Sequence, residues 1–467
     1  MPVVSLNPKD DTPLIDQIVR AVHRLVDDRA LRTGTRLPSI RAFAQDHGVS
    51  RFTVVQAYDR LVAMGYLQSR LGSGFYVAPR PPAPAAESAW SPDHAIDVVW
   101  LLRNTLTDRS TKLIPGAWWL PAAWMEGTGI RKSLRSLSAR QGEFLTAYGT
   151  PAGYLPLREL LCSRLAGMGV PVDAGQLVLT TGVTHALDLV TRYFIRAGDA
   201  VLVDDPGYFI LYGGLKSFGA KLVGVPWNRD GPDTQAMEAL IREHRPRLFF
   251  TNTILHNPTG ACISQAVAHR ILQLAEKYDL MVVEDDIYGD FHPGIPTRLA
   301  TLDQLQRVIY VSSFSKTVSA SLRVGYLACK RELAAQLCDI KLLTGLTTSE
   351  INERLMYQLL AEGHYRKHME KLRARLQAAR HRTIARLEAL GFTLHAEPEG
   401  GMFLWAKPHE DDSAALAGRA AQAGIMLAPG HIFRPHQEAS PWLRFNAAHS
   451  EDEGIFRFLA GAAASAA

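Results

Sequence analysis

A lysine among serines, with an arginine one short loop further on, is the pattern in this chain that most directly indicates chemistry. Residues 312–316 read SSFSK, and Arg323 follows seven residues after Lys316. A lysine amine forms a Schiff base with the aldehyde of pyridoxal 5′-phosphate (PLP), and a hydroxyl and a guanidinium group can hold the phosphate. The pattern therefore predicts a PLP site with Lys316 as its catalytic residue.

The other groups that such a cofactor needs are also present, each after an apolar run that predicts a strand. Asp285 can keep the ring nitrogen protonated, and Tyr288 and Asn257 can face the same crevice at the carboxyl edge of a parallel sheet. Residues 181–185 (TGVTH) open a helix whose free N–H groups suit a phosphate. Tyr208 is a candidate for stacking on the ring.

The first eighty residues predict a different kind of module. Apolar residues recur at helical spacing from Pro13 to about Leu31, and Ser39 and Ser50 each precede a further short amphipathic segment as N-caps. Residues 66–77 then read as a β-hairpin around a Gly-Ser-Gly turn. Three helices followed by a hairpin form a winged helix-turn-helix.

The second helix of a helix-turn-helix enters the major groove with its first residues, and a wing of small residues can approach the minor groove. Residues 37–77 resemble the GntR family of bacterial winged-helix regulators. The resemblance, together with the position of the third helix, gives the candidate DNA-binding residues, which are Arg41, Ser50, Arg51, Thr53 and Gly72.

Residues 79–92 contain five prolines in fourteen positions and predict a semi-rigid linker. Beyond them strand-like and helical runs alternate, which indicates an α/β body with a mostly parallel sheet, followed from about residue 347 by a smaller α+β part. We therefore expect a winged helix at 1–78, a linker at 79–95, a large PLP-binding domain at 96–346 and a small domain at 347–467.

In order and spacing, residues 95–467 resemble the fold-type I aminotransferases. The resemblance implies that Lys316 is the Schiff-base lysine, that Asp285 binds the ring nitrogen, and that Tyr288 and Asn257 bind the phenolic oxygen. The phosphate ligands that it implies are Ser313, Arg323, Thr184 and the N–H of Val183. It also implies that Tyr148 reaches the neighbouring subunit's cofactor and that Arg444 binds the carboxylate of a substrate or effector. Where these enzymes commonly have Pro-Gly before the Leu-Arg pair, this chain has Ala320-Ser321, which puts the shape of that loop in question.

Taken together, the two parts resemble the MocR subfamily of bacterial transcription regulators. The resemblance implies a domain-swapped homodimer that binds promoter half-sites in double-stranded DNA and senses PLP or an amino compound condensed with it. A catalytically active aminotransferase with an appended DNA-binding module is the alternative, because the lysine, the aspartate and the carboxylate-binding arginine are all present. A body that serves only for dimerisation is disfavoured by the same intact set.

Composition adds few constraints. The formal charge is +5, and residues 1–80 hold eleven Lys and Arg against seven Asp and Glu, which fits a basic N-terminal module. The four cysteines have no metal-ligand spacing, and neither a metal site, a signal peptide nor a membrane span is suggested, so a bacterial cytoplasm is expected. A basic stretch at 364–390 is better explained as the solvated face of a helix than as a second DNA surface.

Overall fold

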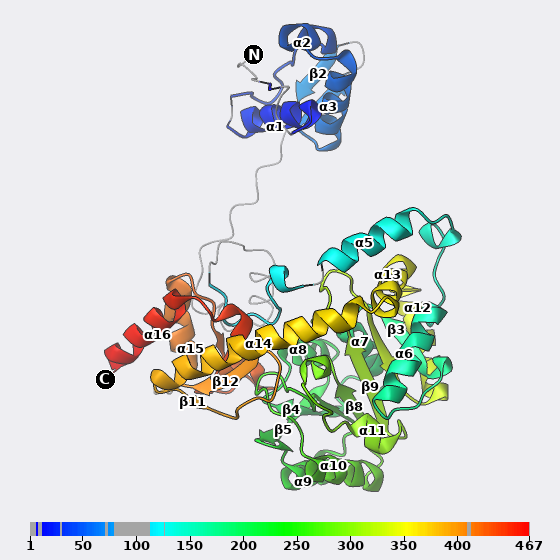
Figure 1. Ribbon diagram of the computed structural model, residues 1–467, viewed down its shortest axis with the longest axis vertical. Coiled ribbons are helices and arrows are strands. Elements are labelled where there is room, and N and C mark those ends of the chain that lie inside the picture. Colours follow the sequence, from blue (N-terminus) through cyan, green and yellow to red (C-terminus); the bar gives the residue numbers. More distant parts are fainter. Residues whose placement is uncertain are drawn as a thin grey trace. The chain divides into compact units, whose positions relative to one another are not determined.

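The structure is a computed structural model, and it describes residues 6–7, 12–28, 30–70, 73–78, 113–125, 127–408 and 412–466. The chain divides into two compact units, Met1–Trp90 and Ser91–Ala467 (Figure 1). The predicted linker at 79–95 and Gly72 of the predicted wing lie outside the described residues.

The N-terminal unit is the predicted winged helix-turn-helix. Its elements are α1 (Leu14–Asp27), α2 (Ile40–His47), α3 (Arg51–Ala63), β1 (Leu67–Arg70) and β2 (Gly74–Val77). Both serines cap the helices as predicted, since Ser39 accepts a hydrogen bond from the N–H of Ala42 at 3.2 Å and Ser50 from that of Thr53 at 3.0 Å. Gly48, with φ of +64°, ends α2 in the left-handed conformation.

This unit has a hydrophobic core of its own. Ile18 and Val22 of α1 pack with Phe43 of α2 and Tyr58 of α3. The first helix ends before the expected residue, at Asp27, because Leu31 leaves the helix and enters the same core with 6% of its surface exposed.

The larger unit contains an eight-stranded mixed sheet in the order β3-β10-β9-β8-β7-β4-β5-β6. Strands β4, β5, β7, β8 and β9 pair in parallel, and β10 lies antiparallel between β3 and β9. The strands are β3 (Leu177–Thr180), β4 (Ala200–Asp205), β5 (Lys221–Asn228), β6 (Gly231–Pro232), β7 (Leu248–Thr251), β8 (Met281–Asp285), β9 (Val308–Ser313) and β10 (Gly325–Ala328).

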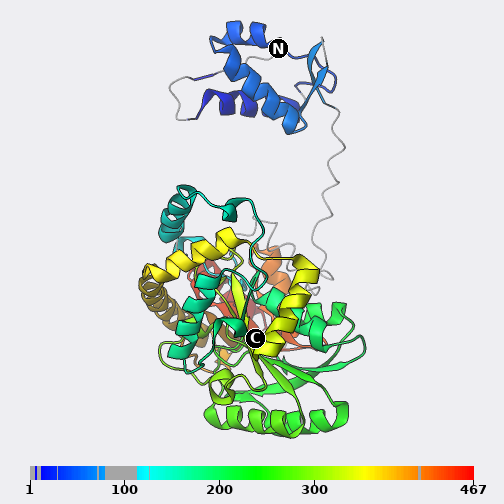
Figure 2. The ribbon, with the colours of Figure 1, turned by 90° about the vertical axis from the view of Figure 1, so that its right-hand side faces the viewer.

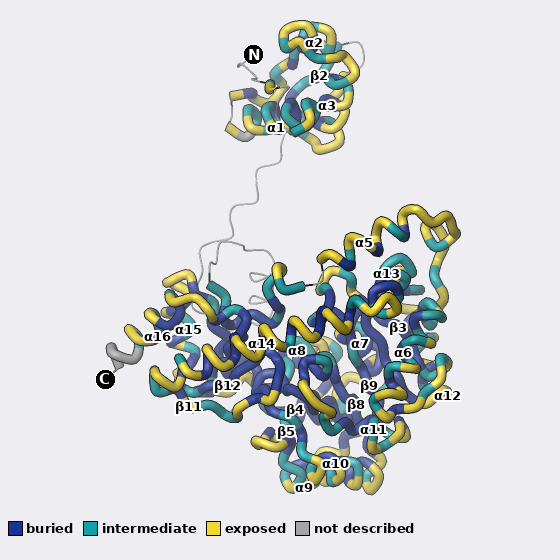
Figure 3. The backbone as a smooth tube through the Cα atoms, in the orientation of Figure 1, coloured by how far each residue is buried: buried dark blue, intermediate teal, exposed yellow. Residues whose placement is uncertain are grey.

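Helices cover both faces of this sheet, which therefore lies inside the unit (Figure 2), and its strands are buried (Figure 3). Alternate strand residues enter two cores: Leu177, Leu179 and Leu202 pack on one face, and Val178 and Val203 on the other. The helices are α5 (Gly127–Ser138), α6 (Leu155–Gly167), α7 (Val183–Phe194), α8 (Phe209–Ser217), α9 (Thr234–His244), α10 (Gln265–Lys277), α11 (Leu299–Asp303), α12 (Arg331–Gly345) and α13 (Glu350–Ala361).

A second, four-stranded sheet has the order β11-β12-β14-β13. The long helix α14 (His364–Ala389) joins the two parts, because Leu372 and Leu376 pack in a core of the large sheet and Leu387 packs in the core of the small one. The remaining elements are β11 (Thr393–Leu394), β12 (Phe403–Lys407), α15 (Ser413–Gln422), β13 (Ala428–Pro429), β14 (Leu443–Asn446) and α16 (Glu453–Ala466).

The fold class is confirmed, and the details that differ have local causes. The helical run expected after residue 347 is two helices, because Gly363 between α13 and α14 adopts φ of +71°. Leu355 and Leu359 of α13 pack in the core of the large sheet. Strands β5, β6 and β10 of the large sheet were not predicted from the sequence. No helix in the described part of the chain is long and apolar enough to cross a membrane.

Candidate cofactor site and DNA-binding surface

The predicted cofactor residues follow the carboxyl ends of neighbouring strands. Asp285 ends β8, Lys316 follows β9, and Asn257 and Tyr208 lie in the segments after β7 and β4. Because parallel strands end at one edge of the sheet, this topology brings the four side chains to a common region.

The amine of Lys316 lies in an environment that disfavours its charge. Its Nζ donates one hydrogen bond, to the carbonyl oxygen of Trp118 at 2.7 Å. Burial, followed by the positive charges of Arg444 and Arg323, lowers its pKa from 10.5 to about 7. A large share of the amine is therefore neutral near pH 7, and only the neutral amine attacks an aldehyde.

Asp285 is a buried carboxylate with few partners. Its Oδ1 accepts a hydrogen bond from the N–H of Ile287 at 3.1 Å, and burial raises its pKa to about 7. Its main chain is fixed by Asn252, whose Nδ2 donates to the carbonyl oxygen of Asp285 at 2.7 Å. A buried carboxylate of this kind would be stabilised in its ionised form by a cationic partner such as a protonated ring nitrogen.

Arg444 and Asn257 form one donor pair. Arg444, only 1% exposed, donates from Nη1 to Oδ1 of Asn257 at 2.8 Å, and its guanidinium lies over the rings of Phe403 and Phe433 at 4.4 and 4.8 Å. Burial lowers its pKa to about 10. Two buried donors here, Nε of Arg444 and Nδ2 of Asn257, have no hydrogen-bond acceptor among the described residues.

Such orphaned donors are costly, and in a native protein they call for an explanation. An acceptor that meets both would be an oxygen with negative charge, such as a carboxylate or the phenolic oxygen of a pyridoxyl ring. The residues present therefore fit the cofactor that the sequence implies.

The two tyrosines differ in their surroundings. Tyr288 is 4% exposed and meets Phe403 edge to face at 5.3 Å between ring centroids, and burial raises its pKa well above 10. Tyr208 is half-buried at the start of α8, and burial raises its pKa to about 12. Both phenols therefore remain protonated near pH 7.

The candidate phosphate ligands gather near the start of α7. Arg323 donates to Oγ of Ser315 at 3.3 Å and to the carbonyl oxygen of Thr181 at 2.9 Å. Gly182 has φ of +81°, and a Cβ there would lie 2.7 Å from Nη2 of Arg323, so only glycine permits this approach.

The hydroxyl of Ser313 accepts a hydrogen bond from the N–H of Ser315 at 3.2 Å. Val183 is the first residue of α7, and Thr184 is exposed beside it. Arg323 itself adopts φ of +51°, so the loop with Ala320 and Ser321 in place of Pro-Gly closes on a left-handed residue.

Tyr148 lies apart from this cluster. Its side chain is 81% exposed, which leaves it accessible to another molecule. Its position is the one expected of a residue that contacts another subunit.

Sequence reasoning missed three positions that support the site. They are Trp118, whose carbonyl oxygen meets Lys316, and the buried side chains Asn252 and Asn446. A contact made by a backbone carbonyl oxygen does not depend on the residue type, so the sequence could not indicate Trp118. Of the three positions, only Asn446 could have been suspected, because it lies two residues after Arg444 on β14.

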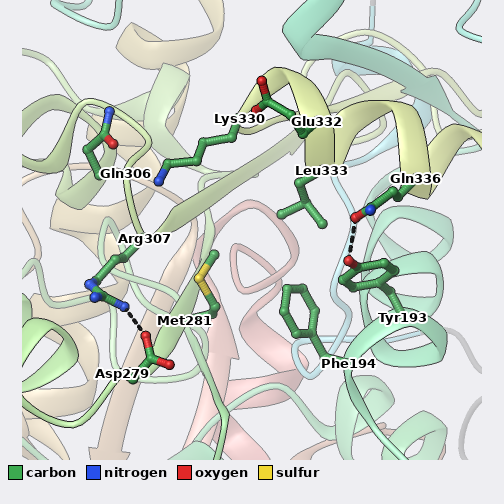
Figure 4. A pocket seen from close by; sticks show the side chains of 10 residues that line it. All are labelled: Tyr193, Phe194, Asp279, Met281, Gln306, Arg307, Lys330, Glu332, Leu333 and Gln336. Carbon is green, nitrogen blue, oxygen red and sulfur yellow. Dashed lines mark hydrogen bonds and ion pairs between the residues drawn. The ribbon is translucent and has the colours of Figure 1, made fainter.

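A surface pocket lies at the opposite ends of the strands (Figure 4). Met281 begins β8, Arg307 precedes β9, and Lys330 precedes α12. Tyr193 pairs there with Gln336, and Arg307 pairs with Asp279 at 2.6 Å. None of the predicted site residues lines it, so the cofactor chemistry is elsewhere.

The candidate DNA-binding residues divide into two kinds. Arg41 and Arg51 are exposed and make no hydrogen bond or ion pair within the described residues. The hydroxyls of Ser50 and Thr53 lie 2.7 Å apart and belong to the helix cap. Gly72 lies outside the described residues.

Comparison with known proteins supports both parts. Residues 98–460 match aminotransferase class I and II, and residues 14–77 match the gntR family of bacterial regulatory proteins. The chain is 28% identical to the uncharacterized HTH-type transcriptional regulator YdfD of Bacillus subtilis, over 95% of this chain and 94% of that one. It is 24% identical to the HTH-type transcriptional regulator NorG of Staphylococcus aureus, over 90% and 97%.

Among solved structures, the kynurenine aminotransferase of Pyrococcus horikoshii, crystallised with PMP, superimposes with a TM-score of 0.73 at 25% identity, over 82% of this chain and 95% of that one. The α-aminoadipate aminotransferase LysN of Thermus thermophilus, complexed with N-(5′-phosphopyridoxyl)-L-leucine, gives 0.71 at 26%, over 82% and 99%. The chain therefore belongs to the aminotransferase class I and II family, and its N-terminal gntR-family domain gives it the two-part arrangement of the MocR regulators.

Proposed function

We propose that this protein is a DNA-binding transcription regulator whose aminotransferase-like body binds PLP on Lys316 and senses PLP or an amino compound that condenses with it. One observation carries the proposal. A single chain holds both a winged helix, whose exposed Arg41 and Arg51 have no partner in the part of the chain that the structure describes, and a buried set of groups suited to PLP.

In the proposed site, Lys316 bonds the cofactor's aldehyde carbon, Asp285 meets the ring nitrogen, and Tyr288 and Asn257 meet the phenolic oxygen. Tyr208 lies against the ring. The phosphate is held by Ser313, Arg323, Thr184 and the N–H of Val183. When bound, PLP makes the carbon next to an attached amine acidic by drawing electrons into its ring.

The effector would add a carboxylate to this arrangement. Arg444 is buried and positively charged, and its Nε has no hydrogen-bond acceptor among the described residues. It therefore suits the carboxylate of an amino acid or an ω-amino acid. Effector binding would favour one conformation of the body, and in a homodimer this would change how two winged helices meet two half-sites. Tyr148 would complete the partner's site across the dimer. We expect such a regulator to act in the cytoplasm.

The first test is selection of genomic fragments from the source organism with PLP-loaded protein, followed by footprinting. Enrichment of a promoter with repeated half-sites is the expected result, and the absence of any preferred fragment with and without PLP would contradict regulation. Lys316→Ala is the companion variant. It should still bind the selected DNA but no longer respond to PLP or amines, whereas an unchanged response would exclude sensing through this lysine.

An active aminotransferase is the second candidate, and the lowered pKa of Lys316 beside an intact Arg444 favours it. Steady turnover of an amino donor and a keto acid at about 1 per second or more would support this function. A single half-reaction without turnover would leave the regulator as the better description.

A further inference from the structure

Phe52 is the exposed aromatic residue on the recognition helix. It is the second residue of α3, and 70% of its surface is exposed. The opposite face of α3, with Val54, Tyr58 and Leu61, fills the core of the N-terminal unit. The fold therefore does not use the ring of Phe52, although its backbone continues the helix.

The neighbours of Phe52 are suited to DNA. Arg51 lies beside it and Arg41 on α2, both exposed and without a partner in the described residues. The hydroxyls of Ser50 and Thr53, at the same helix end, hydrogen-bond to each other, and that of Ser50 also accepts the capping hydrogen bond from the N–H of Thr53. Arginine and phenylalanine are thus the groups left free to contact base edges.

We propose that Phe52 is a specificity-determining residue that packs on the methyl group of a thymine in the major groove of the operator. The thymine methyl is the apolar feature of that groove, and aromatic side chains can contact it. The inference rests on the proposed DNA-binding function and adds to it a base preference.

The test replaces thymine by uracil, which removes only the methyl group. Operators selected from random DNA by the full-length protein are rebuilt with uracil at one thymine at a time. At one position the wild-type affinity should fall about fourfold, the equivalent of one buried methyl group, while Phe52→Ala should bind both versions equally. Met64→Ala, which removes another exposed apolar side chain at the far end of α3, is the matched control and should behave as wild type.

Equal uracil effects on wild type and Phe52→Ala at every position would overturn the inference. A protein that selects no DNA at all would instead contradict the proposed function, so the two failures are distinguishable.

A second, independent observation concerns residues 113–119, which we call the strap. Three side chains in or near the site donate hydrogen bonds to carbonyl oxygens of the strap. They are Nζ of Lys316 to Trp118, Nη2 of Arg444 to Gly116 and Nδ2 of Asn446 to Trp119, each at 2.7 Å. Asn446 also donates to Ala117 at 3.0 Å. The strap therefore accepts one hydrogen bond from each of Lys316 and Arg444, the two side chains that a ligand would bind.

The strap is held to the small sheet by main-chain bonds as well. The N–H of Gly116 donates to Met426 at 2.8 Å, and a Cβ on Gly116 would lie 2.6 Å from the backbone nitrogen of Ala428.

A ligand would compete with two of these contacts. Once Lys316 is bonded to an aldehyde carbon, two of the three ammonium hydrogens leave as water with the aldehyde oxygen, and at most one N–H remains. A carboxylate that binds Arg444 at two points uses Nη2, because both end-on and side-on geometries include that nitrogen, and one of the two N–H groups of Nη2 already donates to Gly116. The carbonyl oxygen of Gly116 and the negatively charged oxygen of the ligand would then lie on the same nitrogen and repel each other.

We infer that the strap occupies part of the effector site in the ligand-free protein and is displaced when a carboxylate-bearing ligand binds. This inference rests on the proposed function and extends it by naming the segment that would move when the effector binds. The displacement should appear as faster hydrogen exchange at the amides of Gly116 and Ala117, which now donate to Met426 and Ile114.

The probe is N-(5′-phosphopyridoxyl)-L-leucine, compared with its decarboxylated analogue N-(5′-phosphopyridoxyl)-3-methylbutylamine, each added to the full-length protein. The leucine adduct should speed exchange in peptides covering 113–119 at least fivefold, and the analogue should not. Equal exchange with both adducts, or slower exchange with the leucine adduct, would overturn the inference. If neither adduct binds, the proposed PLP site itself fails.

A variant gives a second readout without ligand. Asn446→Ala removes two donors to the strap and should speed exchange at 113–119 by itself. Ser413→Ala, which removes a buried hydrogen bond to the carbonyl oxygen of Ser440 in the same part of the fold, is the control and should leave the strap protected. Unchanged strap exchange in Asn446→Ala would contradict the role given to that side chain.

Discussion

Two buried lysines of the larger unit allow a direct test of how the site is built. Lys316 donates one hydrogen bond, and two arginines raise the cost of its charge. Lys341, 1% exposed, donates three, to the carbonyl oxygens of Pro151 and Leu179 at 2.7 and 2.8 Å and to Oγ1 of Thr348 at 3.1 Å. In the cofactor-free protein, Lys316→Met should therefore stabilise the larger unit and Lys341→Met should destabilise it.

The expected changes in the free energy of unfolding follow from the pKa shifts of the two lysines and from the hydrogen bonds that they donate. Lowering the pKa of Lys316 from 10.5 to about 7 corresponds to about 5 kcal/mol against the charged form, while one bond from a charged donor contributes about 1.5–3 kcal/mol. The net gain on Lys316→Met is about 2–3 kcal/mol. For Lys341 the pKa of about 8 corresponds to about 3 kcal/mol, which three such bonds exceed, so Lys341→Met should lose about 2–6 kcal/mol.

The assay is urea unfolding followed by tryptophan fluorescence, since residues 1–78 contain no tryptophan and the signal reports the larger unit. The pH dependence has a definite sign. Between pH 7 and 10.5 the unfolded state binds more protons at Lys316 than the folded state does, so wild-type stability from this group rises with pH. The advantage of Lys316→Met should be largest at pH 6.5 and shrink towards pH 10.

The reasoning would be refuted if, at pH 6.5, the Lys316→Met protein unfolded at a urea concentration as low as that which unfolds Lys341→Met. An advantage that grows with pH would refute the electrostatic account alone.

Three further outcomes are expected. The rate of PLP capture, followed by absorbance, should rise with pH and reach half its maximum near pH 7, because the neutral amine of Lys316 is the nucleophile; a midpoint near 10 would contradict this. Gly182→Ala should weaken PLP binding at least tenfold in a titration, because its Cβ would meet Arg323, whereas Gly213→Ala, with nothing within 4 Å, should not. Ser50→Ala should destabilise the N-terminal unit by about 1 kcal/mol in a thermal melt, and an unchanged melt would argue against the cap.

The position of three candidate site residues after strands could be predicted from the sequence. Lys316, Asp285 and Asn257 each come after a buried apolar run, and the parallel topology then brings them to one edge. Ser39 and Ser50 were identified as caps for a similar reason, since a capping side chain acts on residues three positions away.

Other parts left no local signal. The contact of Lys316 with Trp118 is to a backbone oxygen, which any residue could supply, and the two positions are 198 residues apart. Strand β10 is four residues long and lies between two strands in antiparallel order, so its place depends on pairing and not on its own pattern. The orphaned donors on Asn257 and Arg444 could be found only from the structure, because they depend on which neighbours are missing.

The three consecutive acids at the end of β8 show why spacing alone cannot assign a role. Side chains alternate along a strand, so Glu284 and Asp286 point one way and Asp285 the other. Glu284 accepts hydrogen bonds from the N–H groups of Leu299 and Ala300, both at 2.8 Å, and so holds the start of α11.

Asp286 is likewise committed to structure, since it binds Arg298 at 2.8 Å and the hydroxyl of Tyr310 at 2.7 Å. Asp285 accepts a single local hydrogen bond, from the N–H of Ile287, although it too is buried, with 9% of its surface exposed. A carboxylate that the fold buries and leaves largely unpaired is stabilised only when a cation arrives from outside the chain. Among the three, Asp285 is therefore the group that we expect to pair with a cation such as the ring nitrogen of a bound cofactor, and the strand's alternation is what separates it from its neighbours.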